Sequence, residues 1–195
     1  MKVVREIVAR VRKRAGAAYR ATRHATERLL HPGRHRTVAK RLAKLRRPKS
    51  VLVICYGNIC RSPYLAAVLQ RDLPGIAVSS AGFTSPGRGV PEHSITLSSQ
   101  RGLDLKAHRS RLVTREMLRR NDLIIVMDAL QARSLTKGFG ADPARVVVAG
   151  DLDPEPGPSR AILDPWRQPV AVFAESFERL ERCAEGLLAS LNGKK

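Results

Sequence analysis

The sequence is poor in cysteine and in aromatic residues. Only three cysteines occur among 195 residues, Cys55, Cys60 and Cys183, and aromatic residues make up 4% of the chain. Three cysteines, an odd and sparse set, do not make a disulfide framework, and their spacing does not match a zinc site. We therefore expect a reducing compartment and a reactive thiol, with no metal and no cofactor.

Long hydrophobic runs are also missing. No apolar stretch approaches the roughly 20 residues that a membrane-spanning helix needs. The N-terminus is basic, but the apolar core and cleavage site of a signal peptide do not follow it. We expect a cytoplasmic protein. Hydrophobic residues make up 43% of the chain, which is enough for one domain with a core.

Acidic residues are scarce in the first 50 residues. This segment contains 17 of the 36 Lys and Arg but only two of the 17 acids, Glu6 and Glu27, so its charge is +15. The remaining 19 basic and 15 acidic residues give the rest of the chain a charge of only +4. We predict a basic, partly disordered helical extension over residues 1–48 and a separate, nearly balanced domain over residues 49–195.

Apolar residues recur at helical spacing in this extension, from Val4 through Ala18, with Arg and Lys between them. The pattern predicts an amphipathic helix over about residues 2–30, which Pro32-Gly33 should end. A second short helix is predicted from Val38 to Leu45.

Three roles remain open for the extension. It could be a solvated tail, it could dock on an anionic membrane surface or an acidic partner, or it could bind nucleic acid. Nucleic-acid binding is the least favoured, because no nucleic-acid motif and only one aromatic residue, Tyr19, accompany the charge. An organellar transit peptide is a further alternative in a eukaryotic source.

Beyond residue 50, apolar strand patterns alternate with helical patterns. The predicted strands are 51–54, 76–80, 123–127 and 146–148; the predicted helices are 62–73, 92–101, 114–120, 129–137 and 169–191. This alternation predicts an α/β fold with a doubly wound, four-stranded parallel sheet flanked by helices. Sites in such folds lie at the carboxyl ends of the strands, where Cys55, Ser80 and Asp128 are found.

The most informative stretch runs from Val51 to Pro63. A predicted strand leads to Cys55, and a loop ending at Arg61 leads to Ser62, the predicted N-cap of the next helix. Inward-facing loop amides and the positive end of the helix dipole would form an anion cradle. Arg61 adds a planar fork for two phosphate oxygens, and the positive surroundings would favour the Cys55 thiolate. The pattern indicates phosphoryl transfer; a helix-capping loop with two buried thiols is the non-catalytic alternative.

The string Cys55-Tyr56-Gly57-Asn58-Ile59-Cys60-Arg61-Ser62-Pro63 closely resembles the phosphate loop of the low-molecular-weight protein tyrosine phosphatases. The resemblance covers about residues 50–190. It implies the phosphotyrosine phosphatase I-like fold and hydrolysis of aryl phosphate monoesters through a phosphocysteine. In a bacterial source it suggests a tyrosine kinase of exopolysaccharide assembly as the substrate.

Phosphate-ester cleavage also needs a proton donor for the leaving oxygen. The chain contains three Asp-Pro pairs, at Asp142, Asp153 and Asp164, and spacing alone cannot choose among them, because Asp-Pro is also an ordinary turn signal. The resemblance favours Asp164, because the family carries its general acid in an Asp-Pro-aromatic loop shortly before the last helix, with a Phe nine residues on, and Asp164-Pro165-Trp166 with Phe173 matches this. Asp153 remains the alternative.

The resemblance implies further roles in the site. Asn58, Ser80 and His108 would brace the phosphate loop through hydrogen bonds, with Asn58 in a left-handed conformation. The loop residues expected to bind phosphate or support the loop are Tyr56, Gly57, Asn58, Ile59, Cys60 and Ser62. Tyr56 and Trp166 would form the mouth for an aryl group.

The resemblance also implies a disulfide between Cys60 and the nucleophile, which would protect Cys55 from over-oxidation; a passive buried thiol is the alternative.

Three other functions are alternatives to phosphotyrosine hydrolysis. An arsenate reductase on the same fold would need additional cysteines in the middle of the chain, but none lies between Cys60 and Cys183. Ile59 makes an arginine-phosphate substrate less favoured, since that branch of the family tends to have Thr there. A phosphoprotein-binding module with weak catalysis is the third alternative, and the joint presence of Cys55, Arg61 and Asp164 argues against it.

Overall fold

The fold is built on one parallel sheet of four strands. The computed structural model describes residues 24–45 and 48–193. The strands are β1 (Ser50–Cys55), β2 (Ala77–Gly82), β3 (Leu123–Val126) and β4 (Val146–Val148), in the spatial order β2-β1-β3-β4. Every residue of β3, and every residue of β1 after Ser50, is buried, as continuous apolar runs in a parallel sheet require. The predicted four-stranded parallel sheet is confirmed.

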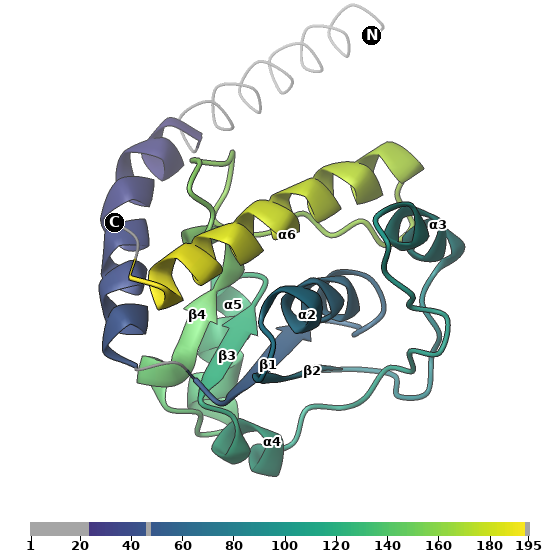
Figure 1. Cartoon of the computed structure of the whole chain (residues 1–195), viewed down its shortest axis with the longest axis horizontal. Helices are drawn as coiled ribbons and strands as arrows, with labels where there is room; N and C mark the ends of the chain where they lie inside the picture. The colour runs from purple at the N-terminus through teal and green to yellow at the C-terminus, as the bar shows by residue number, and fades with distance from the viewer. Residues whose placement is uncertain (1–23, 46–47, 194–195) are drawn as a thin grey trace, which may run out of the picture.

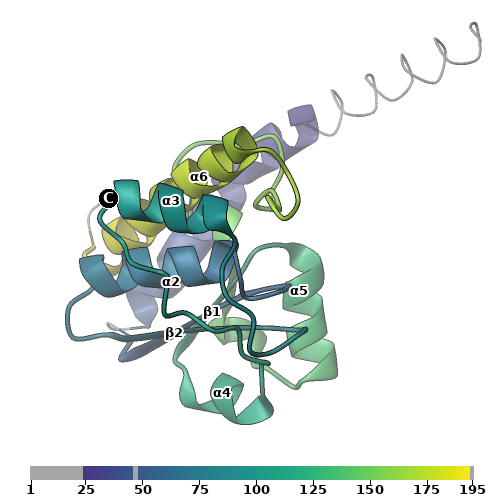
Figure 2. The same ribbon diagram turned by 90° about the vertical axis from the view of Figure 1, so that its right-hand side faces the viewer.

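Helices cover both faces of the sheet. The helices α2 (Arg61–Asp72), α3 (Glu92–Gln100) and α6 (Val170–Leu191) lie on one face, and α4 (Arg115–Arg120) and α5 (Ala129–Arg133) lie on the other (Figure 2). A π-helical turn over Ser134–Gly138 extends α5, and short 3-10 helices occupy Pro143–Arg145 and Ala149–Asp151. This arrangement buries one hydrophobic cluster on each face, which confirms the doubly wound prediction.

The larger cluster holds α6 against α2. Phe177 of α6 stacks on the ring of Tyr64 of α2, with ring centroids 3.7 Å apart. Phe177, Leu180 and Leu187 are fully buried. Burial of such side chains stabilises the fold by about 1.5–3 kcal/mol each, so α2 is firmly anchored behind the loop that precedes it.

The described part of the extension is one continuous helix over residues 24–44, so the predicted break at Pro32-Gly33 is wrong. This helix lies along the β4 edge of the sheet (Figure 1). Val38 and Leu42 are buried in the core, and Arg41 donates hydrogen bonds to the carbonyls of Ala144 (2.6 Å) and Val146 (3.2 Å). A proline inside a helix costs about 3 kcal/mol or more, and this tertiary packing offsets that cost.

The helix prediction for residues 2–23 lies outside the described residues, and the domain boundary at residue 48 stays a prediction. In the part of the chain that the structure describes, no helix is long and apolar enough to cross a membrane.

Ion pairs fix the long loop between β4 and α6. Asp153 is fully buried and accepts hydrogen bonds from Arg179 and Arg182 of α6, each at 3.1 Å. Asp151 pairs with Arg160 of the loop at 2.6 Å and with Arg34 of the helix 24–44 at 3.4 Å. The loop that ends near Asp164 is therefore tied both to α6 and to the extension.

Candidate active site

The phosphate loop surrounds a small cavity at the carboxyl edge of the sheet. Cys55, the last residue of β1, lies at this cavity, which has a volume of about 100 Å³. Residues from two other segments complete its lining, one after β2 and one before α6. The lining residues are Cys55, Tyr56, Gly57, Ile59, Cys60, Arg61, Thr84, Arg88, Asp164 and Trp166.

Two donors point at the Cys55 sulfur. The backbone N–H of Asn58 lies 3.2 Å from Sγ, and the Ser62 hydroxyl donates to it at 3.0 Å. Such bonds stabilise negative charge on the sulfur, which is the form that attacks phosphorus. Ser62 lies inside α2 and is not its N-cap: that position belongs to Cys60, which makes no side-chain capping bond. The N-cap prediction is wrong, because the Ser62 hydroxyl is occupied by the sulfur.

Asn58 is the centre of the bracing network. It has a φ of 51°, and its side-chain amide donates to the hydroxyls of Ser62 and Ser80, both at 2.9 Å. Its side-chain oxygen accepts from the backbone N–H of Arg111 at 2.9 Å, and its carbonyl lies 2.8 Å from His108 Nε2. Burial lowers the pKa of His108, and the neutral ring can donate from Nε2. The structure thus brings Asn58, Ser80 and His108 together.

Arg61 joins the phosphate loop to the loop that contains Asp164. Its side chain is 5% exposed, Nη1 donates to the carbonyl of Ile162 at 3.1 Å, and Nη2 pairs with the Asp164 carboxylate. Among the described residues, Arg61 Nε has no hydrogen-bond partner. A buried donor without a partner is stabilised when it forms a hydrogen bond with an incoming phosphate oxygen.

The three Asp-Pro aspartates have different surroundings. Asp164 lines the cavity and its side chain is 48% exposed. Asp153 is fully buried between two arginines of α6. Asp142 accepts from the backbone N–H of Ala144 and caps the 3-10 helix there. Asp128, at the end of β3, likewise caps α5 through Gln131. Of these four, Asp164 is the one that lines the cavity containing Cys55.

Aromatic rings stand at the mouth of the cavity. Tyr56 is 60% exposed and Trp166 is 39% exposed. A larger hollow of about 630 Å³ adjoins the site beyond Arg61 and Asp164, toward Arg179, but Cys55 does not line it. Of these two hollows, the smaller one is therefore the one that Cys55 lines, together with the two aromatic side chains.

Cys60 differs from Cys55 in its surroundings. Burial, together with the nearby Cys55 and Asp164, raises the pKa of Cys60 to about 12. Cys60 therefore remains a thiol at neutral pH and is a poor nucleophile. The disulfide between the two stays a prediction, since both are free thiols in this structure.

Gly82 was missed as a site residue from sequence. A Cβ at this position would lie 2.8 Å from both the Asn58 nitrogen and the Tyr56 oxygen, so β2 and the phosphate loop meet at a point that excludes a side chain. Gly82 lies only two residues after the predicted site residue Ser80, just beyond the second predicted strand.

The Gly82→Ala variant should therefore displace the phosphate loop. We expect kcat/KM for an aryl phosphate to fall by about 10²-fold, as misplacement of reacting groups by about 1 Å can produce. The matched control is Gly138→Ala, because nothing lies within 4 Å of a Cβ there. Full activity in Gly82→Ala would show that the close approach does not constrain the loop.

Comparisons with known proteins agree with this geometry. The family model described as low molecular weight phosphotyrosine protein phosphatase matches residues 50–195. EpsP of Ralstonia nicotianae, a probable low molecular weight protein-tyrosine-phosphatase, is 33% identical over 69% of this chain and 90% of its own. The Escherichia coli K12 enzyme Wzb is 33% identical over 75% of this chain and 97% of its own.

A solved structure resembles the fold closely. The tyrosine phosphatase Wzb from Escherichia coli K30, in complex with sulphate, matches with a TM-score of 0.66 and 30% identity over 71% of this chain and 95% of its own. The match to the family model spans the sheet, the phosphate loop and the loop that contains Asp164. This chain belongs to the low molecular weight phosphotyrosine protein phosphatase family and is a protein-tyrosine-phosphatase.

Proposed function

We propose that the enzyme hydrolyses phosphotyrosine through a phosphocysteine at Cys55, with Arg61 binding the phosphoryl oxygens and Asp164 acting as general acid. The observation that supports these roles is the meeting of all three side chains at one small cavity. The sulphate that the Escherichia coli K30 relative binds is a tetrahedral oxyanion, as a phosphoryl group is.

The reaction has two steps at one phosphorus atom. The Cys55 thiolate attacks phosphorus, the bond from phosphorus to the tyrosyl oxygen breaks, and Asp164 gives its proton to that oxygen. The Asp164 carboxylate then takes a proton from water as the water attacks the phosphocysteine. The sulfur–phosphorus bond breaks, inorganic phosphate leaves, and the thiolate is restored.

Arg61 and the loop amides hold the three equatorial oxygens in both steps, where negative charge spreads over them. Asn58, Ser80 and His108 hold the loop in the shape that this binding requires.

The aromatic mouth supports an aryl substrate. Tyr56 and Trp166 can contact the faces of a phenyl ring, and Ile59 adds an apolar wall. The test compares a phosphotyrosine peptide with the same peptide containing phosphoserine. We expect turnover of the phosphotyrosine peptide and of a simple aryl phosphate, with the phosphoserine peptide at least about 10²-fold slower because its shorter side chain misplaces phosphorus. Equal rates on both peptides would contradict the proposal.

The physiological substrate is proposed from resemblance. Wzb and EpsP are bacterial protein-tyrosine-phosphatases, and we propose that the substrate of this enzyme is an autophosphorylated bacterial tyrosine kinase of exopolysaccharide assembly. We place this reaction in the cytoplasm.

The alternatives are less well supported. Cys183 is fully buried, so it could not relay a disulfide to solvent as an arsenate reductase needs. A module that only binds phosphoproteins would not need a proton donor, whereas the carboxylate of Asp164 lines the cavity.

A second proposal concerns the extension, for which we propose an anionic membrane surface as the docking partner. The helix over residues 24–44 exposes Arg28, Arg36, Lys40 and Lys44, and Leu29 beside them is 82% exposed. Basic residues near an anionic bilayer contribute about 1 kcal/mol each, and an exposed leucine can insert at the interface.

Cosedimentation with vesicles tests this docking. The variant with Arg28, Arg36, Lys40 and Lys44 changed to Gln should lose most binding to phosphatidylserine vesicles, which the wild type should bind better than neutral vesicles. The fold stays intact because these side chains lie outside the core. Unchanged cosedimentation, or binding only to an acidic protein, would overturn the proposal.

A further inference from the structure

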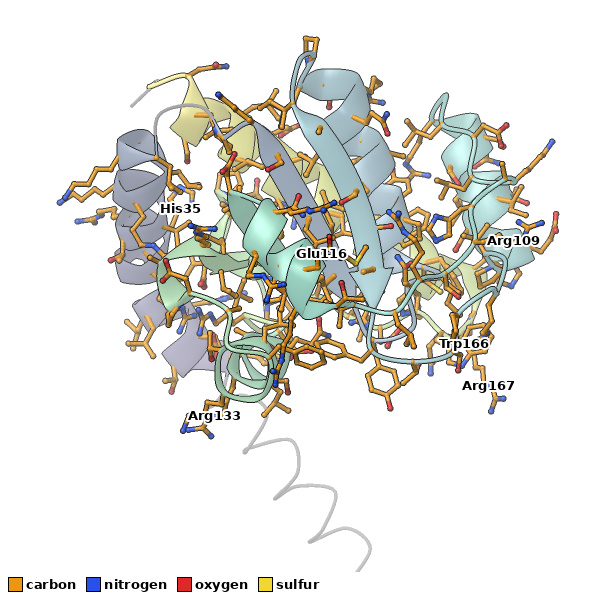
Figure 3. The ribbon with its side chains drawn as sticks, turned by 90° about the horizontal axis from the view of Figure 1, so that it is seen from below. His35, Arg109, Glu116, Arg133, Trp166 and Arg167 are labelled. Carbon is orange, nitrogen blue, oxygen red and sulfur yellow. The ribbon has the colours of Figure 1, made fainter. Side chains whose placement is uncertain are left out.

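Two arginines that the proposed catalytic roles do not use lie at the mouth of the active site. The Arg88 guanidinium carbon lies 4.8 Å from the centroid of the Trp166 ring, and that of Arg167 lies 5.7 Å from it. Arg88 and Trp166 also line the cavity that contains Cys55. Figure 3 shows Trp166 and Arg167 together on one side of the molecule, well away from Arg133.

Neither guanidinium is neutralised by the protein. Within residues 24–45 and 48–193, no carboxylate forms an ion pair with Arg88 or Arg167. Both cations instead contact the aromatic face of Trp166, a contact that leaves their charge uncompensated. They therefore raise the positive potential beside the substrate, outside the phosphate-binding loop.

The backbone of Arg88 is held in place. Its N–H donates to the hydroxyl of the buried Ser110, and its carbonyl accepts from the Ser110 N–H, both at 2.9 Å. Arg111, the residue after Ser110, donates its backbone N–H to the Asn58 side chain and so braces the phosphate loop. Ser110 and Arg111 thus hold both the backbone of Arg88 and the phosphate loop in place. Because the backbone of Arg88 is already ordered, less conformational entropy is lost when a ligand binds this residue.

The position of these arginines identifies what they can contact. A phosphotyrosine in the cavity would place its own backbone and its neighbouring residues at the mouth, beside Trp166. We propose that Arg88 and Arg167 select phosphotyrosine segments that have acidic side chains next to the phosphotyrosine. This inference rests on the proposed function and specifies its substrate class.

Two matched peptides test the selection. Both contain phosphotyrosine, one with Asp on each side of it and the other with Asn at the same positions; a simple aryl phosphate is the reference. We expect the wild type to prefer the Asp peptide in kcat/KM by about five- to tenfold at low ionic strength, the range of two exposed ion pairs. In 1 M salt the preference should fall below about twofold, because the Debye length is then about 3 Å.

Variants locate the effect. Arg88→Ala and Arg167→Ala should each reduce the Asp-to-Asn ratio to about half or less, and Arg88→Lys should restore part of it through its charge. The control is Arg119→Ala, an exposed arginine of α4 that lies just before β3, at the amino end of the strands. This control should keep both the ratio and the activity of the wild type.

The outcomes separate this inference from the proposed function. If the wild type does not hydrolyse the aryl phosphate, the proposed function fails. If it does so but has no preference for the Asp peptide, or if the arginine variants slow all three substrates equally, only the selection is overturned. Weaker binding of the variants to anionic vesicles with an unchanged peptide ratio would also overturn it.

Discussion

The Cys55→Ser variant should lose turnover of aryl phosphates by roughly 10⁵–10⁶-fold, the size of effect expected when a covalent nucleophile is removed. Serine keeps the shape of the side chain but is a far weaker nucleophile at neutral pH. The donors from Asn58 and Ser62 stabilise charge on a sulfur, and a neutral hydroxyl gains little from them. Steady-state hydrolysis with a sensitive fluorescent aryl phosphate measures the loss.

Two controls accompany this variant. Cys183→Ala removes another buried thiol, on α6 and away from the cavity, and should keep wild-type kcat/KM. Cys55→Ser should still bind inorganic phosphate, since Arg61 and the loop amides remain; calorimetry measures this directly. Activity of Cys55→Ser within tenfold of the wild type would mean that another group attacks phosphorus.

Asp164→Asn should slow hydrolysis by about 10²–10⁴-fold when the leaving group is a phenol as basic as tyrosine. The amide cannot give a proton to the leaving oxygen. For an aryl phosphate with a strongly acidic phenol the loss should be much smaller, because that phenolate leaves without a proton. The measurement is kcat for a series of aryl phosphates, plotted against the pKa of the leaving phenol.

The other Asp-Pro pairs provide the control for Asp164. Asp142→Asn should leave the series unchanged, because Asn can also cap the 3-10 helix. Asp164→Asn should also bind inorganic phosphate more tightly, since it removes the carboxylate that pairs with Arg61. If kcat falls by the same factor for every leaving group, Asp164 is not the proton donor.

The sheet could be predicted because its signals are local. The runs Val51–Ile54 and Leu123–Met127 are apolar and rich in β-branched residues, and such runs fit the buried centre of a parallel sheet. The predicted helix over residues 114–120 is a further local case, since the Thr114 hydroxyl caps it by accepting from the backbone N–H three residues ahead, at Met117. Each of these features depends on residues close in sequence.

Two local rules failed where tertiary contacts decide. Ser62 has the sequence context of an N-cap, but the sulfur of Cys55, seven residues earlier, takes its hydroxyl. Pro32-Gly33 has the pattern of a helix end, but the helix passes through it because Val38 and Leu42 are buried in the domain. Neither contact is visible from the adjacent sequence.

The site could be predicted only in part, for the same reason. Cys55 and Arg61 lie in one loop between a predicted strand and a predicted helix, and this local pattern indicates phosphate binding. The choice of Asp164 over Asp153 came from family resemblance; the structure adds a physical difference, since Asp153 is buried between arginines and Asp164 lines the cavity. Gly82 and Arg111 support the phosphate loop from distant segments, and no spacing rule points to such residues.

The phosphocysteine is the central claim, and trapping it is the most direct test. Asp164→Ala slows the water attack that breaks the intermediate down, so the enzyme should accumulate it when mixed with an activated aryl phosphate and quenched rapidly. Peptide mapping by mass spectrometry should then find one phosphoryl group, on Cys55. Turnover with no phosphorylated enzyme, or a phosphoryl group on any residue other than Cys55, would contradict this account.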